Sequence, residues 1–269
     1  MSRAQLRLRS LFAAAFVLFG SALWAADPLT EMVRRSGFVF RGTVVRLHAA
    51  TATVPPEERT AVVKVEEIFE AQTELRRLAG QEVTVRLLAP ASAAAGSSRI
   101  FFTHLYSLGA SAGLEEVGSL DPQEATEVRT RIAAARRDLA DEALQTRLAD
   151  AVAVVVATVV KPRAAEAARN RGASEHDPQW RQARITVESV AKPGASATPK
   201  EALTVFFAGS DDVMWFEAPK LEEGQRAILL LHTGARGAFK PPGLAVVDKL
   251  DVQPVDELAR VKRLLAATR

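Results

Sequence analysis

An internal duplication limits this chain to folds that can be built twice. Residues 113–127 align without a gap on residues 243–257, and seven of these fifteen positions are identical. The identical pairs are Gly113/Gly243, Leu114/Leu244, Val117/Val247, Leu120/Leu250, Asp121/Asp251, Gln123/Gln253 and Glu127/Glu257. Shorter matches precede this block in the same order in both halves: Thr43–Val45 with Thr158–Val160, Val65–Glu66 with Val187–Glu188, Val83–Val85 with Leu203–Val205, and Gly96–His104 with Gly224–His232. Ordered self-similarity of this kind indicates two copies of one structural unit.

Each half has the same predicted order of elements. A short segment with helical spacing comes first, at 29–36 and again at 142–150, and a run rich in Val follows it. Four further short runs have the composition or the period-2 alternation of strands. The predicted strands are 38–47, 61–68, 83–88, 99–104 and 114–118 in the first half, and 152–161, 183–190, 203–208, 227–232 and 244–248 in the second.

A helix is predicted after the fifth strand of each half. In the first half, Asp121 precedes Pro122 and Glu124, which is the arrangement of a capped helix start. The resulting helix, over 122–149, would connect the two copies. The second half keeps Asp251 and Gln253, and its helix is predicted to carry an apolar stripe to the C-terminus, formed by Leu258, Val261, Leu264 and Leu265.

Five short strands between an N-terminal and a C-terminal helix are the plan of the five-stranded OB-type barrel. We therefore expect a mainly β (α+β) protein of two tandem OB-type barrels, each flanked by helices, over residues 26–137 and 138–269.

The strand pattern resembles the netrin-like domain, the fold also found in tissue inhibitors of metalloproteinases. The resemblance is carried by Phe38–Val45, Val63–Ile68, Val83–Val85 and a glycine before the next apolar strand, and it extends over both halves. It implies the barrel fold and a general role in extracellular protein binding. The inhibitors of that family chelate zinc through an N-terminal cysteine, and this chain has no cysteine. That mechanism therefore does not transfer.

The first 25 residues have the features of a secretory signal peptide. Arg3, Arg7 and Arg9 precede an apolar run from Leu11 to Ala26 that ends in small residues. We expect cleavage after Ala25 and a soluble protein in the periplasm or outside the cell. The alternative is a retained N-terminal helix, which would place the protein at a membrane.

Charge argues against nucleic acid as a partner. The chain has 35 Lys and Arg against 32 Asp and Glu, and the three arginines of the first 25 residues account for the whole excess. The remainder is neutral, whereas a nucleic-acid binder needs a cationic surplus. The absence of cysteine excludes disulfides and thiolate metal sites.

Two histidines are candidates for a metal site. His104 and His232 occupy equivalent positions in the two copies, at the end of the fourth predicted strand. The pair could share a metal ion, which would support a metal-binding protein or a metal-dependent enzyme. The alternative is that each is a strand-end residue held by a local hydrogen bond.

Met214, Trp215 and Phe216 are the candidate partner-binding residues. They lie within the segment 210–223, the most distinctive sequence of the second half. Aromatic anchors dominate protein interfaces, so the three could form a binding surface. The alternative is that an aromatic residue of this segment packs into the barrel core.

Sequence motifs of catalysis are missing. The chain contains no phosphate-binding glycine loop, no nucleophile elbow and no zinc-protease motif. We therefore predict an exported, non-enzymatic protein-binding or scaffolding module without a cofactor, whose partner is an envelope or extracellular protein. Two alternatives stay open: the metal protein built on His104 and His232, and an envelope structural protein anchored by its N-terminal helix.

Overall fold

The structure is a computed structural model, and it describes residues 27–51, 54–164, 176–194, 197–234 and 239–268. The predicted signal peptide lies outside the described residues. The chain divides into two compact units, residues 1–125 and 126–269, which we call the N-terminal and C-terminal units. The N-terminal unit contains α1 (Pro28–Arg35), β1 (Phe38–Leu47), β2 (Thr60–Ala71), β3 (Glu82–Arg86), β4 (Ser98–Leu108) and β5 (Ala112–Leu120).

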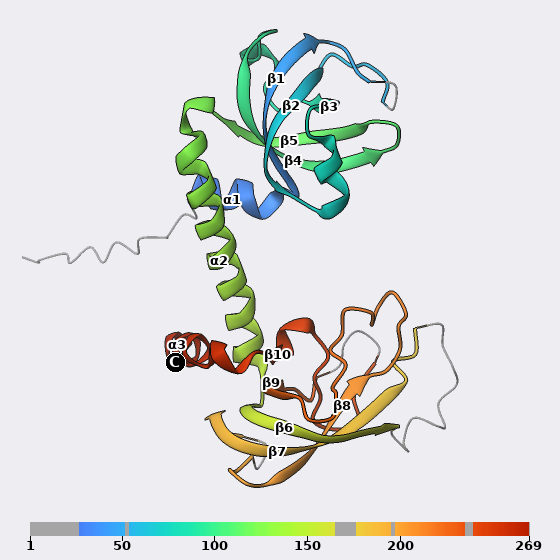
Figure 1. Cartoon of the computed structure of the whole chain (residues 1–269), viewed down its shortest axis with the longest axis vertical. Helices are drawn as coiled ribbons and strands as arrows, with labels where there is room; N and C mark the ends of the chain where they lie inside the picture. Colours follow the sequence, from blue (N-terminus) through green and yellow to red (C-terminus); the bar gives the residue numbers. More distant parts are fainter. Residues whose placement is uncertain (1–26, 52–53, 165–175, 195–196, 235–238, 269) are drawn as a thin grey trace, which may run out of the picture. The chain divides into compact units, whose positions relative to one another are not determined.

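The five strands of the N-terminal unit form a closed barrel in the order β1-β2-β3-β5-β4 (Figure 1). All neighbours are antiparallel except β3 and β5, which run parallel and close the ring. The barrel is filled by apolar side chains that alternate along the strands, and the stacked rings of Phe38, Phe40 and Phe101 lie in this core. The five strands predicted for this half are confirmed, with longer β2, β4 and β5.

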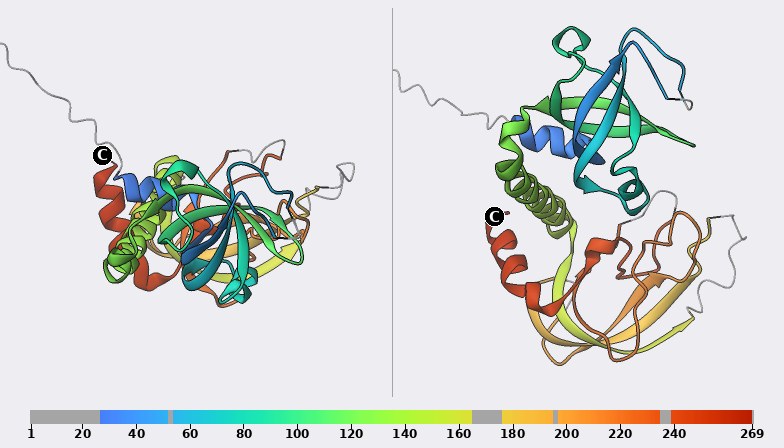
Figure 2. Two further views of the ribbon diagram at one scale, coloured as in Figure 1. Left: turned by 90° about the horizontal axis from the view of Figure 1, so that it is seen from above. Right: turned by 45° about the horizontal axis from the view of Figure 1, so that its top comes forward.

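The C-terminal unit is built on an open five-stranded sheet in the order β10-β9-β6-β7-β8. One face of the sheet forms an apolar core around Val155, Ile185 and Leu229. The other face packs against α2 and α3, whose Leu148 and Leu264 contact it (Figure 2). Its elements are α2 (Ala125–Asp150), β6 (Ala153–Ala164), β7 (Trp180–Lys192), β8 (Ala202–Ala208), β9 (Arg226–Leu231), β10 (Val252–Gln253) and α3 (Leu258–Ala267).

Strand pairing in the two units follows one register. Phe38 of β1 lies opposite Thr103 of β4, and the matching residue Ala153 of β6 lies opposite Leu231 of β9. Each first strand also has three irregularities in its pairing with the second strand. In β1 they fall at Val39/Phe40, Arg41/Gly42 and Val44/Arg46, and in β6 at Val154/Val155, Val156/Ala157 and Val159/Lys161, which are the same positions in the repeat. The duplication seen in sequence is therefore also present in the backbone pairing.

The turns that lead into the fourth strand coincide as well. Gly96 has a φ of 84° and donates its N–H to the carbonyl of Val44 at 2.7 Å. Its counterpart Gly224 has a φ of 78° and donates to the carbonyl of Val159 at 2.9 Å. Both turns require the left-handed backbone conformation that glycine adopts without strain.

The second half departs from expectation at its fifth strand. The continuous strand predicted at 244–248 is wrong: only Ala245 bridges the neighbouring strands, in parallel to Phe206 and antiparallel to His232. Beyond it the chain makes a turn at 249–251, and only then does β10 pair with β9. Asp248 accepts from the N–H of Leu250 in this turn, and Asp251 accepts from the N–H of Asp248. The turn satisfies its own backbone groups and thereby interrupts the strand.

The helices also begin at residues other than those predicted. The helices expected at 122–149 and 142–150 are one helix, α2, which follows a short 3-10 turn over Pro122–Glu124. Asp121 accepts from the N–H of Gln123, so it caps this turn. The C-terminal helix begins at Leu258, several residues after Asp251, which is buried.

Substitution of the two turn glycines tests the structural repeat. We expect Gly96→Ala and Gly224→Ala each to lower the free energy of unfolding by about 1–2 kcal/mol, since a Cβ disfavours the left-handed conformation. An added Cβ at either glycine meets no atom within 4 Å, so the cost is in the backbone alone.

Gly37→Ala is the matched control, because Gly37 has the same open surroundings without a left-handed φ. Chemical denaturation measures all three variants. A loss of stability in only one of the two turn variants would contradict the equivalence of the turns.

Candidate partner-binding loop

The loop between β8 and β9 carries the predicted partner-binding residues, and it is longer than its counterpart. In the N-terminal unit, residues 87–97 join equivalent strand positions, whereas residues 207–225 do so in the C-terminal unit. The second copy therefore has eight extra residues in this connection. We call residues 209–225 the β8–β9 loop.

Trp215 anchors the β8–β9 loop in the core. Its side chain is fully buried, and its ring packs edge-on against Trp180 and Phe239, each at a centroid distance of 5.8 Å. Its indole N–H donates to the carbonyl of His176 at 2.8 Å. Ala245 belongs to the same apolar cluster, so the loop packs on the segment where the first copy has a full fifth strand.

Asp212 fixes the backbone on which Trp215 is carried. Its side chain accepts from the N–H of Met214 at 2.9 Å, and its carbonyl accepts from the N–H groups of Trp215 and Phe216 at 2.8 Å. The hydrogen bond from Met214 lowers the pKa of Asp212 below its usual value, and the ring of His176, 3.0 Å away, acts in the same direction. The turn at 212–216 is therefore held by an ionised carboxylate.

Lys220 closes the other end of the loop. Its ammonium group donates to the carbonyls of Ala208 at 2.9 Å, Ser210 at 2.5 Å and Trp215 at 3.4 Å. Burial lowers the pKa of Lys220. An ammonium with three carbonyl acceptors cross-links both ends of the loop to its middle.

Two apolar side chains of the β8–β9 loop are exposed to solvent. Val213 is 75% exposed and Phe216 is 62% exposed, while Met214 is half-buried and packs against the Trp215 cluster. Of the three predicted residues, only Phe216 is thus a surface residue. Val213 was not predicted, because nothing in the sequence alone indicates that Trp215 turns inward and leaves Val213 in solvent.

The two candidate metal ligands differ in environment. His104 is exposed on β4 and lies opposite Glu115 of β5. His232 is buried at the end of β9. Among the residues that the structure describes, no group of three or more His, Cys, Asp or Glu side chains is arranged to hold a metal ion.

His232 instead belongs to a buried polar cluster around Asp251. Its Nε2 atom lies 3.1 Å from Oδ1 of Asp251, an ion-pair distance, although the geometry is not that of a hydrogen bond. Arg147 of α2 donates from Nε and Nη2 to the same carboxylate at 2.6–2.9 Å. The N–H groups of Val247 and Asp248 donate to Oδ2. This carboxylate therefore ties α2 to the turn that interrupts the fifth strand.

The pKa of Asp251 reflects these contacts. Burial by itself would raise the pKa, but the neighbouring His232 ring, the N–H of Val247 and the guanidinium of Arg147 outweigh burial and hold the pKa below its usual value. Asp251 is fully buried, so it is a structural carboxylate without access to a substrate.

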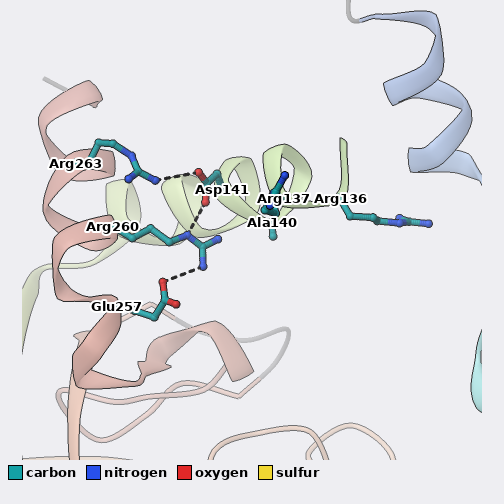
Figure 3. Close-up of a pocket in the computed structure, with 7 residues that line it drawn as sticks. All are labelled: Arg136, Arg137, Ala140, Asp141, Glu257, Arg260 and Arg263. Carbon is teal, nitrogen blue, oxygen red and sulfur yellow. Dashed lines mark hydrogen bonds and ion pairs between the residues drawn. The ribbon is translucent and has the colours of Figure 1, made fainter. Parts of the chain in front are cut away.

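A cleft of about 460 Å³ lies between α2 and α3 (Figure 3). Arg260 of α3 pairs with Asp141 of α2 at 2.5 Å and with Glu257 at 3.4 Å, and Arg263 lies 3.5 Å from Asp141. Figure 3 shows these four side chains gathered at one end of the cleft, with Arg136 directed away from them. The ion pairs hold α3 against α2, so this part of the cleft is occupied by structural contacts.

No protein-family model matches the chain, and no curated protein shows significant similarity to it. None of the helices in the described part of the chain has the length and apolar content that a membrane crossing requires. The function must therefore be inferred from the molecule's own surfaces.

The depressed pKa of Asp251 predicts an acid-sensitive C-terminal unit. The carboxyl of an unfolded aspartate has a pKa of about 3.9. Stabilisation by the ionised group is complete above that value and is lost as pH falls through the lower pKa of the folded state. We expect Asp251→Asn to cost about 3–5 kcal/mol at neutral pH, because it leaves the Arg147 guanidinium without its buried partner.

Chemical denaturation at a series of pH values is the measurement, and the variant should show a flatter dependence on pH than the parent chain. Asp121→Asn is the matched control at the equivalent position, where the side chain is exposed and an asparagine can still accept from Gln123. Equal effects of the two substitutions would contradict the structural role of Asp251.

Proposed function

We propose that this chain is an exported, non-enzymatic protein-binding module built from two copies of an OB-type barrel of the netrin-like kind. Export is supported by the signal-peptide features of the first 25 residues. The second barrel is supported by the shared register of the two units and by Ala245, which links β8 and β9 as β5 links β3 and β4. In this proposal the fifth strand of the second copy is reduced to one bridge.

The observation that carries the proposal is the pair of exposed apolar side chains, Val213 and Phe216, on a preorganised loop. Exposed apolar side chains on a mobile loop would lose conformational entropy on binding, which weakens association. Here the backbone is already fixed by Asp212 and Lys220, and Trp215 anchors it in the core. The loop can therefore present its aromatic side chain to a partner pocket at little entropic cost.

The partner in this proposal is an envelope or extracellular protein with an apolar pocket for Phe216. The β8–β9 loop contains five carboxylates and one cation, Lys220, which disfavours a polyanion as its partner, because such partners select cationic surfaces. Glu217 follows Phe216 in the sequence and pairs with Lys249 at 3.2 Å, and polar residues of this kind usually surround the apolar anchors of protein interfaces.

Substitution of the exposed pair should separate binding from folding. We expect Val213→Ser with Phe216→Ser to abolish capture of the partner while leaving the free energy of unfolding within about 0.5 kcal/mol of the parent chain. Trp215→Ala should instead cost about 3–5 kcal/mol, because it removes a buried aromatic side chain.

Affinity capture with mass spectrometry measures the first effect, and chemical denaturation measures the second. Leu88→Ser is the matched control, since Leu88 is 59% exposed and lies in the other unit. A photoreactive phenylalanine analogue at position 216 should cross-link the same partner directly. Retention of that partner by the double variant would refute the proposed surface.

Cell fractionation with N-terminal sequencing tests export separately. We expect the chain in the periplasmic or extracellular fraction, beginning at or near Ala26, because cleavage at that point removes the charged and apolar signal segment. Full-length chain in the membrane fraction would contradict this part of the proposal.

A further inference from the structure

The outer face of β6, β7 and β8 carries a groove of about 430 Å³ with an unbalanced positive charge. Among the described residues, its charged lining consists of Lys161, Arg163 and Arg184, with no carboxylate. Arg163 donates to the side-chain oxygen of Gln182 in the amide orientation that satisfies both groups. Within the described parts of the chain, none of the three cations takes part in an ion pair.

The strand register brings two of these cations directly opposite each other. Lys161 of β6 is paired with Arg184 of β7, and Arg163 follows two residues after Lys161. Like charges that face each other across neighbouring strands destabilise a sheet. An anion bound over the groove would relieve this repulsion.

The first copy shows how the same face is neutralised. Arg46 is the repeat counterpart of Lys161, and it pairs with Glu82 at 3.1 Å. The counterpart of Glu82 in the second copy is Ala202, which lines the groove. The counterpart of Arg184 is the buried Val62. The second copy has therefore lost the carboxylate and gained a cation.

The same face is covered in the first copy. The loop after β1 reaches Thr84, whose hydroxyl accepts from the N–H of Thr51 at 2.8 Å, and Thr84 is fully buried. Its counterpart Thr204 is exposed and lines the groove.

We propose that this groove binds an acidic polypeptide segment in an extended conformation, with carboxylates at alternate positions. Alternate residues of an extended chain repeat every ~6.6–6.8 Å on one side, which matches the spacing of side chains two residues apart on a strand. Lys161 and Arg163 have this spacing along β6, and Arg184 adds a cation beside them. The lining residues that the structure describes include no aromatic side chain, whereas single-stranded nucleic acid is held by stacking of its bases on aromatic rings.

Ala202→Glu is the sharpest test, because it restores the carboxylate that the first copy places beside Arg46. The probe is a fluorescent peptide in which glutamate alternates with threonine. Its binding to the purified chain is measured by fluorescence anisotropy. We expect Ala202→Glu to weaken binding about tenfold and Ala202→Gln to leave it unchanged, because the effect is one of charge. Rising salt should weaken binding of the parent chain as well.

A second variant shows whether weaker binding results from the lost charge or from misfolding. Lys161→Gln with Arg184→Gln removes the facing cations and should also weaken binding about tenfold, while relief of the like-charge pair leaves stability equal or higher. Arg46→Gln in the first copy is the control and should not change binding, since that cation is already paired with Glu82.

Other results would contradict the proposed acidic peptide ligand. Failure of the glutamate peptide to bind, or equal binding by the Ala202→Glu variant, would overturn the inference. A single-stranded oligonucleotide that binds more tightly than the peptide, and whose binding Ala202→Glu abolishes, would also overturn it. That result would assign the groove to nucleic acid. The inference is independent of the β8–β9 loop: Phe216→Ser should leave peptide binding intact, and Ala202→Glu should leave capture by the loop intact.

Discussion

The bulged pairing of the first strand with the second is the constraint on which both units depend. β1 pairs with β2 on one side and with β4 on the other, and β6 pairs likewise with β7 and β9. In each unit, two of the three irregularities leave the extra residue on the second strand and one leaves it on the first. Such bulges bend the strand that carries them and increase the local twist of the pair. The three irregularities at equivalent positions of β1 and β6 therefore set the curvature in both copies.

Closure of the curved sheet differs between the copies, and the buried carboxylate of Asp251 explains how the second copy tolerates the difference. In the first copy, β5 completes the ring by pairing with β4 from Ala112 to Leu120 and with β3 over three residues. In the second, the chain leaves the ladder after Ala245 and turns, which exposes backbone groups that would otherwise be paired. Asp251 accepts from two of these N–H groups and from Arg147, so the break in the strand is stabilised by hydrogen bonds to one ionised group.

The strands could be predicted from the sequence where they show apolar alternation or occur in both halves. Nine of the ten strands were found because residues such as Val83 and Val85 alternate with polar neighbours, and because each half supports the interpretation of the other. The strand predicted at 244–248 was wrong for the same reason: its similarity to 114–118 concealed that Asp251, unlike Asp121, turns inward. An aspartate has the same local propensity in both places, and only the tertiary partners Arg147 and His232 decide its burial.

The candidate surfaces were harder to predict because they depend on which copy a residue belongs to. Trp215 and Phe216 are adjacent and equally apolar, yet one is wholly buried and the other is mostly exposed, since a tight turn directs them to opposite sides. The net charge of each half could not predict the cluster of groove cations, because a net charge does not depend on where the charged residues lie. Both the β8–β9 loop and the groove lie where the second copy differs from the first, by an insertion in one case and by loss of a carboxylate in the other. After a duplication, the shared bulges and turns preserve the strand arrangement, so the positions that have diverged are those at which a new binding role can arise without loss of the fold.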